Sequence, residues 1–221
     1  MPRDGPDIPF ADMDRLRRRK RLWRWLERLL MVVGVLCLGY VLYVYSEARL
    51  YQALEDRELD AILSSRSNAP VGVPSPKGTT MLPRPAPGSL VGRIEIPRLG
   101  VSAIIRAGSD ASTLKLAVGY IPGTALPGEN GNVGLAGHRD TFFRKLRNIG
   151  PEDEIRVTTR NGVFNYVVQR TNIVNPKDVW VLNPTTQPVL TLVTCYPFYY
   201  VGSAPQRFIV RATLASSKPA G

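Results

Sequence analysis

The stretch Thr191-Leu-Val-Thr-Cys-Tyr-Pro197 places one cysteine, Cys195, at the end of an apolar, β-branched run. Residues of this kind favour a β-strand, and proline is typical of a position where a strand stops. The stretch therefore predicts a strand that ends in a sulfur nucleophile. A buried, unreactive cysteine is the alternative interpretation of the same pattern.

Two other strand-like runs also carry a reactive side chain at one end. His138, the only histidine of the chain, follows Asn132-Val-Gly-Leu-Ala-Gly137, and Arg207 opens Arg207-Phe-Ile-Val-Arg-Ala212. Taken singly, the histidine is also explained as a surface residue and the arginine as a solvated charge. Neighbouring strand ends of a barrel meet on one rim, so the three together predict a site with Cys195 as nucleophile and His138 as acid and base.

The region around these runs reads largely as strands. Short apolar runs alternate with turn formers, and Asn161-Gly162 between two alternating runs is a strong hairpin signal. About eight short strands in about 125 residues favour a closed or nearly closed barrel, because closure removes exposed sheet edges. Short helical patterns are expected at 110–117, capped by Asp110 or Ser112, and at 140–147, capped by Asp140. The predicted fold class is mainly β.

The amino-terminal part of the chain has a different composition. A basic run precedes an uncharged apolar segment whose length is near the lower limit for a membrane-spanning helix. Helix formers follow, and then proline-rich sequence that stays extended. The predicted division is a basic tail at 1–28, a transmembrane helix at 29–46, a helical stalk at 47–65, a proline-rich linker at 66–89, a catalytic β-barrel at 90–215 and a disordered tail at 216–221.

The basic flank also predicts the orientation of the membrane segment. Because positive charge stays inside, the amino terminus is expected in the cytoplasm and everything after residue 46 outside the cytoplasmic (inner) membrane. A cleaved signal peptide is the alternative. Against it, the apolar run exceeds a usual signal core, and no small-x-small site follows Tyr43-Val-Tyr-Ser46.

Charge and metal-ligand content restrict the partners. The formal net charge of the 221 residues is +11, which favours anionic surroundings such as lipid headgroups or an acidic envelope polymer. No aromatic-plus-basic motif accompanies the charge, so nucleic acid is not a predicted partner. One histidine and two distant cysteines, Cys37 and Cys195, make neither a zinc set nor a structural disulfide, so no cofactor is required. Glu152-Asp-Glu154 could bind calcium, but a solvated turn beside Pro151 is the favoured interpretation and calcium is unsupported.

The motifs resemble those of a known family, the sortases, which are membrane-anchored cysteine transpeptidases of bacterial surfaces. Thr191-Leu-Val-Thr-Cys195 is similar to the Thr-Leu-x-Thr-Cys signature of that family. Gly137-His138 and Arg207 agree in order and spacing, and the resemblance covers about residues 90–214. The flanks 137–143 and 194–198 are most similar to class D.

This resemblance implies an eight-stranded barrel and a two-step acyl transfer. Cys195 would cleave a Leu-Pro-x-Thr-Gly-like sorting signal of a secreted protein between threonine and glycine, giving a thioacyl enzyme. An amine of a peptidoglycan precursor or of a pilin lysine would resolve it. His138 would move the protons, Arg207 would hold substrate and oxyanion, and Thr194 would contact the substrate or contribute to the oxyanion site.

Two alternatives remain open beside the sortase interpretation. One is another cysteine peptidase or an L,D-transpeptidase, although that class would want arginine close behind the cysteine, where this chain has Tyr196-Pro197. The other is a catalytically inactive binding barrel. Within the sortase interpretation, Met81–Gly88 shows no lid motif, so a self-inhibited pilin-type enzyme is not supported.

Overall fold

The computed structural model describes residues 21, 23–43, 46, 57, 83–200 and 202–219. It divides into two compact units, Met1–Arg49 and Leu50–Gly221. In the first unit the helix Trp23–Tyr43 is, by length and composition, able to cross a membrane, and a signal sequence would share these features. This described helix begins before the predicted span of 29–46. The predicted basic tail up to residue 20, most of the stalk and the linker up to residue 82 lie outside the described residues.

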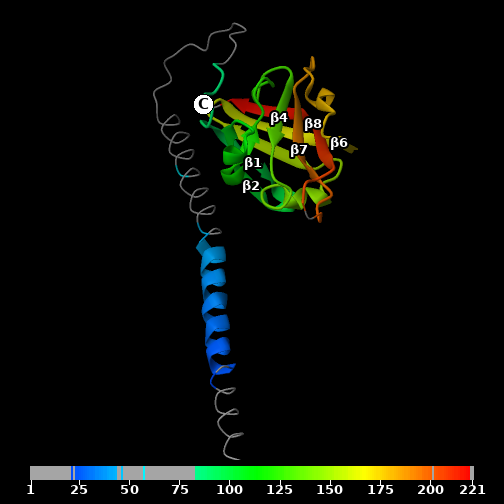
Figure 1. Cartoon of the computed structure of the whole chain (residues 1–221). Helices are drawn as coiled ribbons and strands as arrows, with labels where there is room; N and C mark the ends of the chain where they lie inside the picture. Colours follow the sequence, from blue (N-terminus) through cyan, green and yellow to red (C-terminus); the bar gives the residue numbers. More distant parts are fainter. Residues whose placement is uncertain are drawn as a thin grey trace, which may run out of the picture. The chain divides into compact units, whose positions relative to one another are not determined.

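The second unit contains a closed eight-stranded barrel with short helices between its strands, and the predicted fold class is confirmed (Figure 1). The strand order around the barrel is β1-β2-β3-β4-β7-β8-β6-β5. The elements are β1 (Leu90–Ile96), η1 (Pro97–Leu99), β2 (Val101–Ala107), α2 (Ala111–Leu116), β3 (Val118–Tyr120), β4 (Asn132–Ala136), η2 (Arg144–Asn148), β5 (Glu154–Thr159), β6 (Gly162–Val174), η3 (Val179–Leu182), β7 (Val189–Tyr196) and β8 (Gln206–Pro219).

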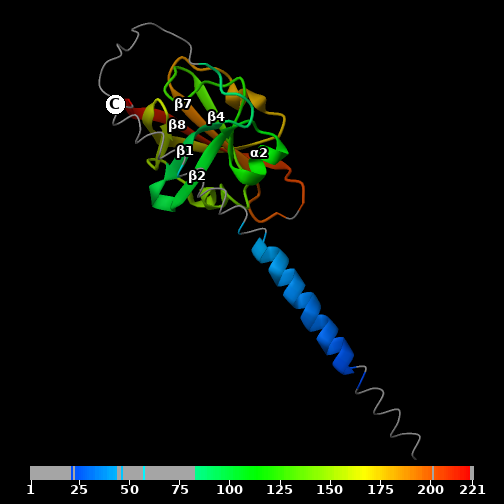
Figure 2. The same cartoon turned by 90° about the vertical axis from the view of Figure 1, so that its left-hand side faces the viewer.

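The pairing of β4, β7 and β8 determines where the reactive side chains lie. Strands β4 and β7 are parallel, whereas β8 is antiparallel to β7. Figure 1 and Figure 2 both show the three strands side by side. The carboxyl ends of β4 and β7 therefore meet at the edge where β8 begins.

Side chains along these strands point alternately into the barrel and toward its outer face. Leu190 and Leu192 of β7 are fully buried in the core, as are Leu135 of β4 and Val210 of β8. Because successive side chains of a strand point to opposite faces, Cys195 lies on the outer face. The core thus fixes which residues face solvent at the strand ends.

The hairpin and one of the two short helices form as predicted. Strands β5 and β6 pair up to Thr159 opposite Gly162, so the Asn161-Gly162 turn is confirmed. The side chain of Asp110 accepts a hydrogen bond from the Thr113 amide and caps α2. The prediction at 140–147 was wrong in detail: η2 is a 3-10 helix whose amino-terminal cap, Phe143, makes no side-chain capping bond.

The barrel begins at the predicted residue 90 and extends beyond the predicted end at residue 215. Strand β8 continues to Pro219, because Ser216, Ser217 and Lys218 pair with the first residues of β6. The segment 216–219, predicted as disordered tail, is therefore strand. Ahead of β1, the Gly88 amide donates to the Ala107 carbonyl at 2.7 Å, so the last linker residues already pack on the barrel.

Candidate active site

His138 and Cys195 follow neighbouring, parallel strands at the same level. Ala136 pairs with Val193, and the Gly137 amide donates to the Val193 carbonyl at 3.1 Å. His138 comes two residues after Ala136, just as Cys195 comes two residues after Val193. The pairing therefore brings the histidine and the cysteine to one edge of the barrel.

Arg207 reaches the same edge from the opposite direction. It is the register partner of Cys195 across the antiparallel β7–β8 pair. Directly opposed residues point to the same face, with Cβ atoms about 4.5–5.5 Å apart. The backbone thus brings all three predicted residues to one edge of the barrel, with Cys195 and Arg207 on its outer face.

Each of these side chains is partly exposed. Cys195 is a free thiol, and Arg207 uses only Nη1 in the hydrogen bonds found among the described residues, to the carbonyls of Ala204 and Gln206 at 3.3 and 3.0 Å. His138 lies in a turn closed by a 3.0 Å bond from the Phe143 amide to its carbonyl. Donors and acceptors at this edge are therefore available to a bound substrate.

Gly137, directly before the histidine, packs closely against a buried aromatic ring. A Cβ on this residue would lie 2.7 Å from the ring of Phe143, which is fully buried. A larger residue would have to displace the ring or the backbone that carries His138.

Thr194 lies on the other side of β7 from Cys195. It is 2 % exposed, and its Oγ1 donates to the Gly137 carbonyl at 2.7 Å. The hydroxyl thereby holds the backbone just before His138. The roles predicted for Thr194, contact with the substrate or part of the oxyanion site, stay predictions.

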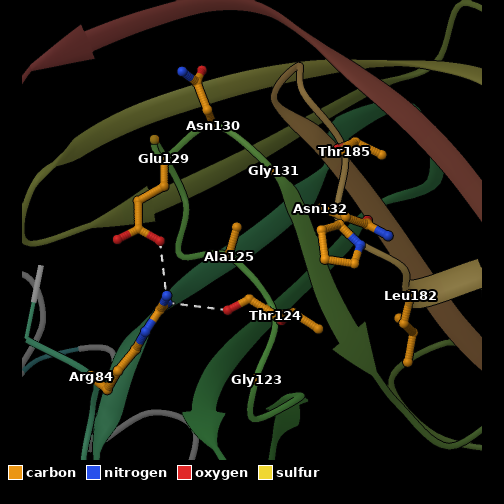
Figure 3. A pocket seen from close by; sticks show the side chains of 12 residues that line it. Arg84, Gly123, Thr124, Ala125, Glu129, Asn130, Gly131, Asn132, Leu182 and Thr185 are labelled. Atoms are coloured by element: carbon orange, nitrogen blue, oxygen red, sulfur yellow. Dashed lines mark hydrogen bonds and ion pairs between the residues drawn. The ribbon is translucent and has the colours of Figure 1, made fainter. Parts of the chain in front are cut away.

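A pocket lies at the opposite end of β4 and β7 (Figure 3). Its volume is about 510 Å³, and Asn132, the first residue of β4, forms part of its wall. Arg84 reaches across it to Glu129, at 3.2 Å, and to the Thr124 carbonyl, at 3.1 Å. This pocket holds none of the predicted catalytic residues.

A buried polar network closes the strand pair at that far end. The Asn132 amide donates to the carbonyls of Val181 and Asn183 at 2.9 and 3.1 Å, and its oxygen accepts from Thr191 at 2.7 Å. Arg211 donates to the same Val181 carbonyl at 3.0 Å. Side chains of β4 and β8 thereby hold η3, and Thr191 of β7 holds Asn132 in place.

The acidic turn considered for calcium has a structural partner. Asp153 is buried, and its carboxylate accepts hydrogen bonds from Arg98 and from the Gly150 amide. These bonds lower the pKa of Asp153, with the Arg98 contact as the largest cause. Among the residues that the structure describes, no three side chains of the metal-binding types come together.

Comparison with known proteins identifies the fold and the family. Residues 94–215 match the sortase domain, which is more than half of the chain. The chain belongs to the sortase family. Members of this family are cysteine transpeptidases.

Two curated relatives are similar to this sortase. Sortase D of Bacillus subtilis is 38 % identical over 128 residues, which cover 58 % of this chain and 65 % of the relative. Sortase SrtE1 of Streptomyces coelicolor is 30 % identical over 60 % of this chain and 42 % of the relative. The match covers less than two thirds of either relative, and the similarity to class D agrees with the sequence motifs.

Solved structures give the same result for the barrel. A Clostridium perfringens Sortase D5 transpeptidase is 33 % identical, with a TM-score of 0.55, over 60 % of this chain and 83 % of that chain. Sortase E1 of Streptomyces coelicolor, solved with a tripeptide in its active site, is 29 % identical, with a TM-score of 0.54, over 62 % of this chain and 94 % of that chain.

Sequence reasoning missed two features near these strands. Arg139 directly follows the only histidine, yet nothing in the local pattern indicates its partners, which lie in the β7–β8 loop. Asn132 and Thr191 carried a weak signal, since a polar residue within an apolar run often has a buried partner.

Proposed function

We propose that this sortase cleaves Leu-Pro-x-Thr-Gly-like sorting signals of secreted proteins and transfers the acyl part to an amine. The observation that carries the proposal is the register of β4, β7 and β8, which aligns His138, Cys195 and Arg207 at one edge. The similarity to a Sortase D5 transpeptidase supports it.

The first step forms a thioester. The Cys195 thiolate attacks the threonine carbonyl carbon, and the electrons of the carbonyl double bond move to oxygen. Arg207, a fixed cation with unused N–H groups, stabilises this oxyanion. The carbon–nitrogen bond then breaks as protonated His138 gives its proton to the departing glycine amine.

The second step reverses these roles. An amine of a peptidoglycan precursor or of another protein's lysine attacks the thioester carbonyl, and His138 takes its proton. The carbon–sulfur bond breaks and Cys195 leaves as thiolate. A single acid–base group suffices, because the two half-reactions are mirror images.

We further propose that the helix Trp23–Tyr43 anchors the enzyme in the cytoplasmic membrane with the barrel outside. The basic run before it supports a cytoplasmic amino terminus. Protease treatment of intact spheroplasts tests this, because an outward barrel is digested while an amino-terminal epitope tag is protected. Protection of the barrel contradicts the topology.

The reaction is tested with the full chain in detergent micelles. The protein is incubated with Leu-Pro-x-Thr-Gly peptides, with and without triglycine, and followed by intact-mass spectrometry. An adduct on Cys195, free glycine peptide and a transfer product that grows with triglycine are expected. We expect no adduct with Cys195→Ala, and rates about 100-fold or more lower with His138→Ala and Arg207→Ala.

Arg156→Ala is the matched control, because Arg156 is an exposed residue of β5. Its rate should equal that of the parent. Absence of any adduct, while Cys195 still reacts with iodoacetamide, contradicts the acyl donor assigned here and favours another substrate or a binding barrel.

A further inference from the structure

One side chain joins the segment after His138 to the segment after Cys195. Arg139 donates from Nη1 to the Pro197 carbonyl at 3.0 Å. Its Nη2 donates to the carbonyls of Tyr200 and Gly202 at 2.6 and 3.0 Å. All three acceptors belong to the β7–β8 loop, so one guanidinium binds three points of a single loop.

Backbone pairing does not extend this far. The last backbone bond between the two segments, among the described residues, runs from the Gly137 amide to the Val193 carbonyl. Arg139 lies two residues beyond Gly137, and Pro197 lies four residues beyond Val193. The contact therefore continues the β4–β7 connection past the end of the sheet, on the far side of the two reactive residues.

The chemistry of the contact suits a fixed link. A guanidinium presents N–H groups in a rigid plane, and hydrogen bonds from a charged donor are stronger than neutral ones. The guanidinium carbon also lies 5.8 Å from the ring centre of Tyr200. Lysine has a single nitrogen on a flexible stem and does not reproduce this geometry.

A second arginine from the same side makes a weaker contact with the loop. The guanidinium carbon of Arg147 lies 5.4 Å from the ring centre of Tyr199. Tyr199 is 77 % exposed, and no hydrogen bond from Arg147 to the loop is present among the described residues. Arg147 therefore offers a matched control: it touches the same loop without holding its carbonyls.

We propose that Arg139 is a positioning residue that fixes His138 relative to Cys195 by tying together the two segments that follow them. This inference rests on the proposed function of those two residues. Displacement of a reacting group by about 1 Å can cost about 100-fold in rate. Loss of the link should therefore lower turnover without removing a group that touches the substrate.

The first test needs no substrate. In the full chain with Cys37→Ser, Cys195 is the only thiol, and its rate of alkylation by iodoacetamide is measured from pH 5 to 10. The His138→Ala variant supplies the profile of an unassisted thiol. We expect the profile of Arg139→Gln to move toward that of His138→Ala and the profile of Arg147→Gln to match the parent.

The second test measures peptide transfer by the same variants. Arg139→Gln is expected to lower kcat about 10- to 100-fold with less than about a threefold change in KM, because the lost effect is positional. Arg139→Lys should recover part of kcat. Thermal unfolding of each variant shows whether the barrel remains folded. If Arg139→Gln unfolds, kcat of Arg139→Lys is compared with that of the parent instead.

The outcomes separate this inference from the proposed function. Unchanged alkylation and transfer in folded Arg139→Gln overturn the inference, and so does an equal loss in Arg147→Gln. If the parent transfers no peptide while alkylation still depends on His138 and Arg139, the proposed function fails and the positioning role stands.

Discussion

The two ends of the β4–β7 strand pair use their polar side chains in opposite ways. At the far end Asn132 and Thr191 are buried, and both bond within one network that holds η3. At the other end Cys195 and His138 are partly exposed and keep their side chains free of hydrogen bonds among the described residues. Saturated polar groups stabilise the fold, whereas groups with spare bonding capacity remain available for chemistry.

The pocket and the proposed reactive residues lie at opposite ends of the strand pair. The 510 Å³ pocket lies at the far end, where the polar groups are already engaged. Cys195 and Arg207 lie instead at the other end, where β7 and β8 meet the loop that joins them. In this barrel the proposed site therefore lies apart from this pocket.

Replacement of Cys195 by alanine should have the largest effect on peptide transfer, because it removes the proposed nucleophile from its end of the strand pair. Without a thiolate there is no covalent intermediate, so we expect transfer to fall at least about 1,000-fold. Thermal unfolding should be nearly unchanged, because the thiol has no hydrogen-bond partner among the residues that the structure describes. Cys37→Ser is the control and should retain full activity, and transfer by Cys195→Ala at the parent rate would disprove the assigned nucleophile.

Replacement of Asn132 by alanine should have the opposite effect: it should lower the stability of the barrel and leave the Cys195 end unchanged. It removes the side-chain donor of the Asn183 carbonyl and the acceptor of the Thr191 hydroxyl, and we expect the free energy of unfolding to fall by about 2 kcal/mol. With Trp23 and Trp25 changed to phenylalanine, Trp180 of η3 is the only tryptophan and reports urea unfolding.

Asn130→Ala is the control for this far-end variant. Asn130 borders the same pocket but is exposed, so its loss should leave the urea midpoint unchanged. Equal destabilisation by both variants would show that the network adds nothing beyond the local loop.

Low pH should weaken the ion pair between Arg98 and Asp153, which lies in a third region, away from both ends of the β4–β7 pair. The pKa of Asp153 is lowered in the folded state, mainly by the hydrogen bond from Arg98. A lowered pKa means that this carboxylate stabilises the fold above its ordinary value of about 4, and that the stabilisation is lost as pH falls through the folded pKa. We expect Asp153→Asn to lower the urea midpoint at pH 7. The difference between the urea midpoints at pH 7 and pH 3 should be smaller in this variant than in the parent, and an equal difference would contradict this.

Replacement of Arg84 by alanine should give the smallest effect. Its ion pair with Glu129 joins side chains that are 48 % and 19 % exposed, so the expected loss is below about 1 kcal/mol and shrinks in high salt. Alkylation of Cys195 should be unaffected. A slower alkylation rate would show that the far end influences the reactive end.

Local patterns were sufficient to predict most of the fold. The alternation of apolar residues, the Asn161-Gly162 turn and the Asp110 cap are short-range signals, and each leads to the observed element. The extent of β8 was missed, because Ser216–Lys218 are polar and form strand only against β6. Pairing between distant strands is not encoded in a short window.

The same distinction holds for the site. Cys195, His138 and Arg207 stand at the ends of apolar runs, so the sequence could place them together. The inward direction of Thr194 was also available, since Leu190 and Leu192 precede it at intervals of two. The partners of Arg139 could not be predicted from the sequence, because they depend on the path of a loop that follows a different strand.

The strand order also constrains the sequence in which the barrel assembles. Without β7 and β8 the remaining strands form an open sheet, β4-β3-β2-β1-β5-β6, whose two unpaired edges are β4 and β6. The carboxyl-terminal hairpin fills that gap, and it carries Cys195 and Arg207 already opposite each other. Since the chain is made from its amino end, we expect the proposed nucleophile to reach His138 only when β7 pairs with β4, so that a chain without its last two strands would lack the proposed site.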